Sequence, residues 1–445
     1  MGLGWGDRYW LKYTIVIASQ LTAAALLVTF WLDAQRVNSG IWIAAFLVIV
    51  AAANYCFASS LAAWEAILTF LKVLVVIGLI VLAIVLMFAP RYQPEFLFWG
   101  GQLESHGYGE VLGRLSAICE TLPSATFAYL GCEMIGMASL RTRDPCRTTA
   151  RAIKLTSYRL VGFNVVSMIL VVMLVPNGMI HVQSYDDTSS TTAMSAFVVA
   201  IQMARIPVLP HLLNACILLF ALSSAAFSLY LTTGALYRMS LANMAPACLS
   251  TTDTRGVPVF ALALCSCLAS LAYLNITHDS KIVFSYLVNL VTMLSILTWV
   301  SILITHLSFK RAQKAQGIPD SALAFRAPLG QVGSWIALFG CLVVSLTRIV
   351  VFIDHIGTGT GYHASIMSYL GIPLYLALLF GYKLVTRGKS VNPTTSDLFN
   401  HHRLVESAVS GAVSGPEPIS LCADVRKALG RQKQRAKRFA QLWVS

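Results

Sequence analysis

The chain has 445 residues, of which 57% are hydrophobic and only 11% are charged. A soluble protein of this length needs a more polar surface, so the composition excludes a soluble globular protein and indicates a polytopic membrane protein. The 32 lysines and arginines outnumber the 19 acidic residues and give a formal net charge of +13, a balance that also occurs in nucleic-acid-binding proteins. Where these charges lie decides between the two explanations.

Ten apolar runs follow one another along the chain, each close to the ~20 residues that an α-helix needs to cross a bilayer. We therefore predict an all-α membrane protein with about ten transmembrane helices. The first run is as long as a full span and has no small-residue cleavage site in a polar flank, which argues against a cleavable signal peptide. The predicted spans are 10–32, 39–56, 67–89, 122–140, 158–176, 209–234, 258–275, 283–305, 333–353 and 366–386.

The basic residues between the spans indicate the orientation of the chain, because cytoplasmic loops carry an excess of lysine and arginine. With a cytoplasmic N-terminus, 25 of the 32 basic residues fall on the cytoplasmic side, Lys12 among them, and six fall outside. Both termini are therefore predicted to be cytoplasmic. The basic excess reflects membrane topology, so we expect no nucleic acid partner.

Lys72 is the remaining basic residue, and it lies within the predicted span 67–89. An ionisable side chain inside a span is costly and is a candidate functional group for that reason. The alternative is that Lys72, about a turn and a half inside the span, extends its ammonium group to the cytoplasmic surface. Glu65, seven residues earlier on the same helical face, is expected at the membrane interface.

The fourth predicted span contains TFAYLGCEMIG at residues 126–136, in which Gly131 and Gly136 flank the carboxylate of Glu133. Glycine tolerates non-helical backbone, so this pattern predicts an interrupted helix. Non-helical backbone at membrane depth persists only where it is buried in protein or lines a water-filled cavity, and half-helix ends there can hold the charged groups of an amino acid. The alternative is that the glycines only allow close helix packing.

The sixth predicted span carries a stripe of hydroxyl side chains. Ser224 and Ser228 are four residues apart, as are Ser228 and Thr232, so these residues share one helical face. They are candidates for a polar site. Such hydroxyls also often bond only to the carbonyl four residues earlier in their own helix, and the residues alone leave both explanations open.

The ten cysteines are scattered along the chain. The one close pair, Cys265 and Cys267, lies in an apolar run without a nearby histidine, so we interpret it as small apolar helix residues rather than a metal or redox site. We find no phosphate-binding loop, metal-ligand spacing or nucleophile elbow. The sequence therefore predicts neither an enzyme nor a cofactor.

The chain divides into a transmembrane domain, 1–386, and a polar cytoplasmic tail, 387–445. The tail contains NPTTSD and SGAVSGPEP, which are typical of loop or disorder. Seven basic residues lie between Arg426 and Arg438, and each can add about 1 kcal/mol to the binding of anionic lipid. Contact of the tail with anionic lipid or trafficking proteins, and a solvated tail without a partner, both stay open.

Three long blocks in the same order resemble fungal amino-acid permeases, the yeast amino-acid transporter group of the amino acid–polyamine–organocation superfamily. FAYLGCEMIGMASLRTRDPCRTTARAIK, from Phe127, is similar to the sixth helix and following loop of that family. PHLLNACILLFALSSAAFSLYLTTGALYRMS with TRGVPVFALALCSCLASLAYLN is similar to its eighth and ninth helices. THLSFKRAQKAQGIPDSALAFRAPLGQVGSWIALF is similar to the loop from its tenth to its eleventh helix. The resemblance covers about residues 5–386.

The resemblance implies a LeuT-like fold of two inverted repeats, in which the first and sixth helices are broken at mid-membrane and the substrate binds between them. It implies proton-coupled uptake of amino acids, typically at the plasma membrane. The backbone of Ala128, Tyr129, Leu130 and Gly131 would face the substrate, with Glu133 directly after it.

The resemblance also implies three coupling residues. Lys72 matches a lysine of the family's fifth helix, whose ammonium occupies the place of a sodium ion in related transporters. Ser223 and Ser228 match hydroxyl positions of the eighth helix.

The chain departs from the family pattern at its start, because the segment from Leu3 to Trp31 is similar to the third helix. The alignment therefore predicts that the chain as written lacks the first two helices. Gln20 stands where the family has a glutamate, and Cys132 replaces a threonine. We predict secondary active transport of amino acids, with a non-transporting nutrient sensor or an inactive truncated permease as alternatives. The residues do not specify which amino acid is transported.

Overall fold

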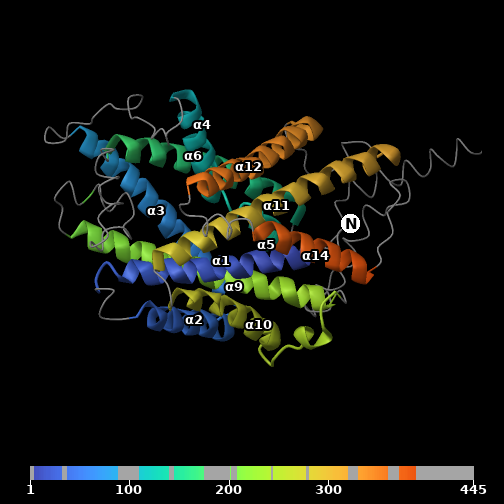
Figure 1. The fold of residues 1–445 in the computed structure, drawn as a ribbon. Helices are drawn as coiled ribbons and strands as arrows, with labels where there is room; N and C mark the ends of the chain where they lie inside the picture. The colour runs from blue at the N-terminus through green and yellow to red at the C-terminus, as the bar shows by residue number, and fades with distance from the viewer. Residues whose placement is uncertain are drawn as a thin grey trace, which may run out of the picture.

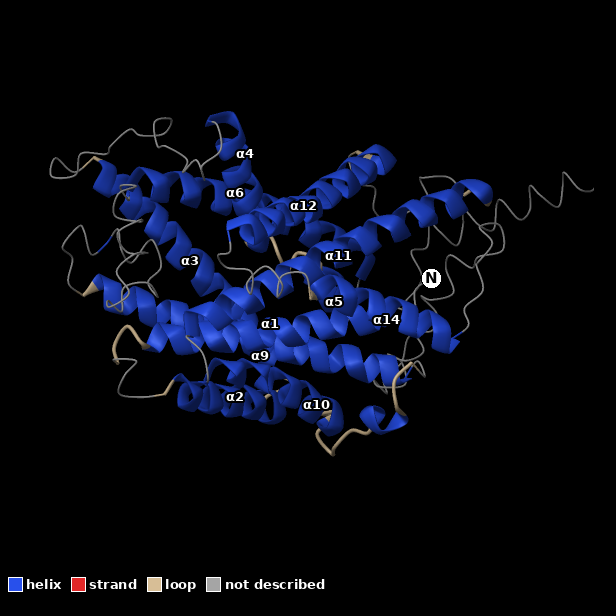
Figure 2. Ribbon diagram, in the orientation of Figure 1, coloured by secondary structure: helices blue, strands red, loops and turns tan. Residues whose placement is uncertain are grey.

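The computed structural model describes residues 5–32, 38–88, 110–139, 145–174, 201, 208–241, 244–276, 280–318, 329–358 and 370–386. Throughout these residues the regular elements are helical (Figure 2). The predicted all-α class is confirmed. The helices are α1 (Trp5–Val28), α2 (Ser39–Cys56), α3 (Leu61–Met87), α4 (Glu110–Phe127), α5 (Met134–Ser139), α6 (Pro145–Leu174), α9 (Leu209–Leu241), η2 (Ala247–Ser250), α10 (Val259–Ala269), η3 (Ser270–Ile276), α11 (Ser280–Ala315), α12 (Gly330–Thr358) and α14 (Gly371–Thr386).

Each of the ten predicted spans overlaps a helix. Among the described residues, seven helices are long and apolar enough to cross a membrane, namely α1, α2, α3, α6, α9, α11 and α12. Two further apolar helices, α14 and the run of α10 into η3, are shorter. The fourth predicted span is divided between α4 and α5.

Helix α1 lies in the middle of the bundle, packed against α9 and α11 (Figure 1). Its side chains Ile17, Leu21 and Ala24 are fully buried and share one cluster with Ala225 and Leu229 of α9. Small residues let the two backbones approach closely, and such packing holds helices together in lipid, where no hydrophobic driving force acts between them. Polar groups on α1 therefore lie inside protein.

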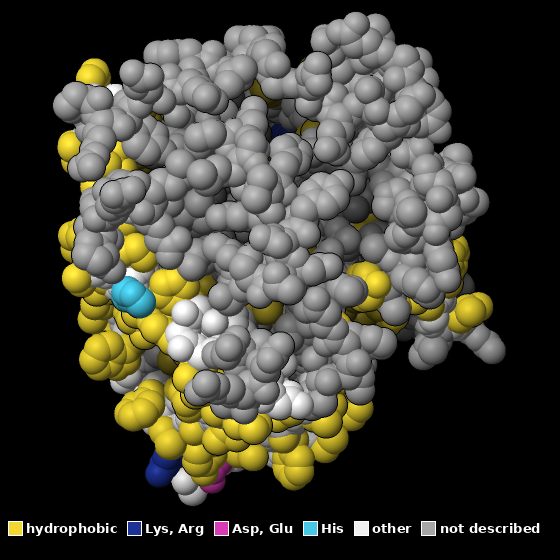
Figure 3. Space-filling view, turned by 60° about the vertical axis from the view of Figure 1, so that its left-hand side comes forward, with side chains coloured by type: hydrophobic (Ala, Val, Ile, Leu, Met, Phe, Trp, Pro, Cys, Tyr) yellow, Lys and Arg dark blue, Asp and Glu magenta, His cyan; other side chains and the backbone are white. Residues whose placement is uncertain are grey.

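The outer helices expose apolar side chains. Phe70, Leu74 and Ile77 of α3 are between about half and three-quarters exposed, and α6 and α12 expose similar residues. Hydrophobic side chains make up most of the described surface seen in the space-filling view (Figure 3). An apolar surface of this extent is typical of a protein that contacts lipid.

Two buried asparagines join neighbouring helices through the backbone. The Asn54 amide of α2 donates a hydrogen bond to the carbonyl of Ala226 in α9 at 3.0 Å. The Asn214 amide of α9 donates to the carbonyl of Leu27 in α1, also at 3.0 Å. Both asparagines are almost fully buried. Helices α1, α2 and α9 are thus connected by directional bonds as well as by packing.

The fourth predicted span is interrupted, as the sequence predicts. Helix α4 ends at Phe127, α5 begins at Met134, and residues 128–133 form turns between them. Gly131 has a φ of 96°, in the region that favours glycine because a side chain there is strained. The interruption exposes the backbone of this segment to neighbouring helices.

Gly131→Ala should lower the free energy of unfolding by about 1–3 kcal/mol, because alanine is strained at this φ. Among the described residues, no heavy atom other than those of its chain neighbours lies within 4 Å of the position that a Cβ would take, so the expected cost comes from the backbone. Gly136→Ala is the matched control, because its site is equally open but lies within α5. Thermal unfolding of the purified protein measures both, and equal effects would contradict the strained backbone at Gly131.

Candidate substrate site at the interrupted helix

Glu133 is the residue before α5, and only 5% of its side chain is exposed. Two groups of α1 contact its Oε1 atom. The ammonium of Lys12 forms an ion pair with it, and the hydroxyl of Tyr13 donates a hydrogen bond to it at 2.9 Å. The carboxylate thus joins the interrupted segment to the central helix.

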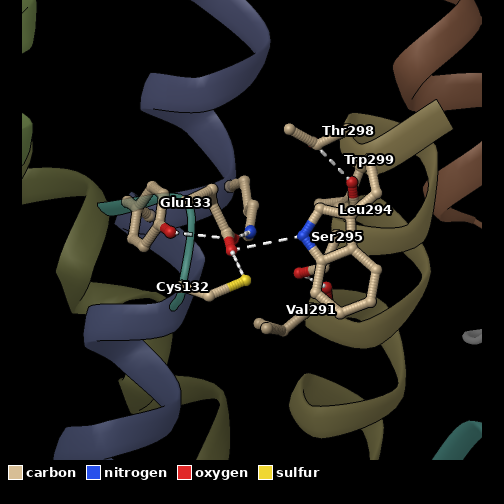
Figure 4. A network of polar contacts seen from close by, with 9 residues as sticks. Cys132, Glu133, Val291, Leu294, Ser295, Thr298 and Trp299 are labelled. Carbon is tan, nitrogen blue, oxygen red and sulfur yellow. Dashed lines mark hydrogen bonds and ion pairs between the residues drawn. The ribbon is translucent and has the colours of Figure 1, made fainter. Parts of the chain in front are cut away.

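The other oxygen of Glu133 faces α11. The indole Nε1 of Trp299 donates a hydrogen bond to Oε2 at 3.2 Å, and the thiol of Cys132 donates to the same atom at 3.5 Å. In Figure 4 the carboxylate lies between the ribbons of α1 and α11, with the donors directed at it. An ionised carboxylate accepts about four hydrogen bonds, so both oxygens are fully satisfied.

The expectation that Lys12 is one of the cytoplasmic loop charges is wrong. Its position near the start of the first span placed it among the cytoplasmic charges, but it is 1% exposed and paired with Glu133. The physical reason is that a buried carboxylate needs an opposite charge, and α1 runs past the interruption at this level. The sequence carried one signal for this pair, since an acid inside a span implies a partner.

The predicted substrate-facing backbone has contacts of its own. The amide of Asn164 in α6 donates to the carbonyl of Ala128 at 3.3 Å, a contact that sequence reasoning missed. Leu130 packs against the buried cluster that contains Ile15 and Val291, whereas Tyr129 is half-buried. The carbonyl of Gly131 accepts a hydrogen bond from the N–H of Met134 at 3.0 Å, which closes a turn at the start of α5.

Lys72 of α3 lies against α9. Its ammonium contacts the hydroxyls of Ser223 at 3.1 Å and Ser224 at 3.4 Å. It also forms an ion pair with Glu65 on its own helix at 2.7 Å, and Ser223 donates a hydrogen bond to that carboxylate. Glu65, expected only at the interface, is therefore a member of this second polar cluster.

Ser228 is buried in α9, one helical turn beyond Ser224. The backbone carbonyl of Ser228 accepts a hydrogen bond from the hydroxyl of Thr232. The Thr232 hydroxyl thus bonds to the carbonyl four residues earlier in its own helix. The hydroxyls that contact Lys72 are those of Ser223 and Ser224. Of the two predicted serines, the structure brings Ser223 to the lysine.

A membrane protein whose described elements are all helices, and in which a span is broken beside a buried charge pair, has the architecture of a secondary transporter. A comparison with protein families identifies the family of transporters to which the chain belongs. The chain belongs to the amino acid permease family, whose model matches residues 1–391. The predicted function, transmembrane transport of amino acids, is confirmed at the level of this family.

Curated fungal relatives agree with the family. The dicarboxylic amino acid permease of Saccharomyces cerevisiae is 34% identical over 414 residues, which are 91% of this chain and 68% of that protein. The proline-specific permease of the same yeast is 31% identical over 87% of this chain and 62% of its own length. A probable proline-specific permease of Schizosaccharomyces pombe is 29% identical over 87% of this chain and 70% of its own length. The chain thus spans about two thirds of the length of these relatives.

Proposed function

We propose that the protein carries out proton-coupled, secondary active uptake of amino acids at the plasma membrane, with both termini cytoplasmic. The observation that carries the proposal is the interruption at Gly131, which brings the buried Glu133 next to the ammonium of Lys12. Binding sites of secondary transporters are typically built at such interruptions, where alternating access moves one bundle about a fixed site.

In this proposal the two polar clusters have different roles. The residues Ala128 to Gly131 and Glu133 form part of the substrate site. The Lys72 cluster, with Ser223, Ser224 and Glu65, couples movement of α3 against α9 to the protonation of the site, and Ser228 contributes from the next turn of α9. The transmembrane domain comprises 1–386. The tail, 387–445, lies outside the described residues, and its basic run holds anionic lipid.

Uptake by the full chain in proteoliposomes tests the proposal. With an acidic outside and an alkaline inside, radiolabelled amino acids should accumulate above their equilibrium level, and a protonophore should abolish that accumulation. A panel containing aspartate, glutamate, asparagine, glutamine and proline covers the substrate names of the relatives. Uptake that the protonophore leaves unchanged would contradict proton coupling, and binding without any uptake would favour the sensor.

A further inference from the structure

The Lys12–Glu133 site consists of hydrogen-bond donors around a single carboxylate. Lys12 and Tyr13 reach one oxygen, and Trp299 and Cys132 reach the other. Among the described contacts, every lone-pair position of Glu133 is in use, so its carboxylate is not free to accept from a substrate ammonium group. The site therefore recruits anions, and a carboxylate is the group that its donors already accommodate.

An amino acid offers such a site two kinds of carboxylate. The α-carboxylate stands beside the α-ammonium, which would be forced against the ammonium of Lys12 and a set of donors. A side-chain carboxylate is separated from that cation by one or two methylene groups. Because like charges in a buried site are strongly unfavourable, the side-chain carboxylate fits the donors better.

We propose that Lys12 determines substrate specificity by binding the side-chain carboxylate of acidic amino acids, which displaces the carboxylate of Glu133 from its ammonium. This inference rests on the proposed function. A neutral side chain at the same place leaves the buried ammonium without an anionic partner when Glu133 withdraws, which is costly. A cationic side chain is repelled.

The charge balance requires a proton. Lys12 and Glu133 are neutral as a pair, so an added side-chain carboxylate gives the buried site one net negative charge. A proton that Glu133 takes from the outside solution restores neutrality and is released inside when Glu133 pairs with Lys12 again. The other groups that face Glu133 are Tyr13 and, behind it, Tyr9 of α1 with Arg238 of α9 nearby, Trp299 of α11, and Cys132 of its own segment.

Matched pairs of ligands test the selection by Lys12. Competition binding on the full chain, purified and reconstituted in nanodiscs, compares L-aspartate with L-asparagine and L-glutamate with L-glutamine, which differ mainly in side-chain charge. The acidic member of each pair should bind at least about tenfold more tightly at acidic pH, a ratio in the range of close charge pairs. Its affinity should fall as the pH rises, whereas that of the amide changes little.

Substitutions test whether Lys12 causes the ratio of affinities between each acidic amino acid and its amide. In Lys12→Met the ratio should fall to about one, and Lys12→Arg should restore most of it because the charge returns. The double variant Lys12→Met/Glu133→Gln should also lose the ratio while keeping the buried site neutral, which separates loss of selection from loss of folding. Lys314→Met, an exposed lysine at the end of α11, is the matched control and should keep the ratio.

The outcomes separate the two proposals. Preference for asparagine and glutamine, or an acidic preference that survives Lys12→Met, overturns the role of Lys12 and leaves transport standing. Equal weakening of aspartate and asparagine in Lys12→Met assigns the ammonium to the α-carboxylate and overturns the side-chain assignment. If no amino acid binds the wild-type chain, the proposed function fails and this inference fails with it. If acidic amino acids bind preferentially but are not taken up, the selective role of Lys12 is supported and the proposed transport function is overturned.

Discussion

Replacing Lys12 by methionine should destabilise the folded protein by about 3–5 kcal/mol. The substitution keeps most of the apolar stem but removes the ammonium, so the carboxylate of Glu133, 5% exposed, is left without its opposite charge. Tyr13 and Trp299 still donate to that carboxylate, but neutral donors do not replace a charge. Reversible unfolding in mixed micelles, followed by tryptophan fluorescence, measures the change.

A double-mutant cycle tests whether the cost belongs to the pair. Glu133→Gln alone should also be destabilising, because it leaves the buried ammonium of Lys12 unpaired. Lys12→Met combined with Glu133→Gln should cost much less than the sum of the two single changes, since neither charge is then buried alone. Additive costs in the double variant would contradict direct pairing of these residues.

Lys72→Ala should reduce the accumulation of substrate to its equilibrium level, which is a loss of all uphill uptake. The ammonium of Lys72 joins α3 to α9 through Ser223 and is paired with Glu65. Alanine removes the positive charge that α3 directs at α9 in this cluster and leaves the carboxylate of Glu65 without that ion pair. Uptake driven by an imposed pH gradient in proteoliposomes gives the accumulation ratio directly.

Controls keep the Lys72 result interpretable. Lys72→Arg retains the charge and should retain part of the accumulation. Lys154→Ala removes an exposed lysine of α6 and should leave the ratio unchanged. A thermal unfolding midpoint near that of the wild type shows that Lys72→Ala has folded. Full accumulation in that variant would exclude the coupling role.

The sequence predicted the features whose signal is local. Two glycines around an acid predict the interruption because Gly131 can adopt a positive φ that other residues avoid. Spans could be placed because about 20 apolar residues are required to cross a bilayer. The family resemblance named Lys72 and Ser223 separately as coupling candidates, and the structure places them in contact at 3.1 Å, whereas their coupling role stays a prediction.

The partners of Glu133 could not be identified in the same way. Lys12 lies 121 residues earlier in the chain and Trp299 lies 166 residues later, and no local pattern relates them to Glu133. Lys12 near the start of a span has the same pattern as an interfacial charge, so only the packing of α1 at the centre of the bundle distinguishes the two. Asn164 was missed because an amide in an apolar helix carries no signal of its target.

The two asparagine bonds limit how the molecule can move. Asn54 joins α2 to α9, and Asn214 joins α9 to α1, and both side chains are almost fully buried, so breaking either bond would leave a buried polar group unpaired. We therefore expect these three helices to move together rather than to separate. Lys12 is carried on α1 and Glu133 on the broken segment between α4 and α5, so any movement of that segment away from α1 is expected to break their ion pair.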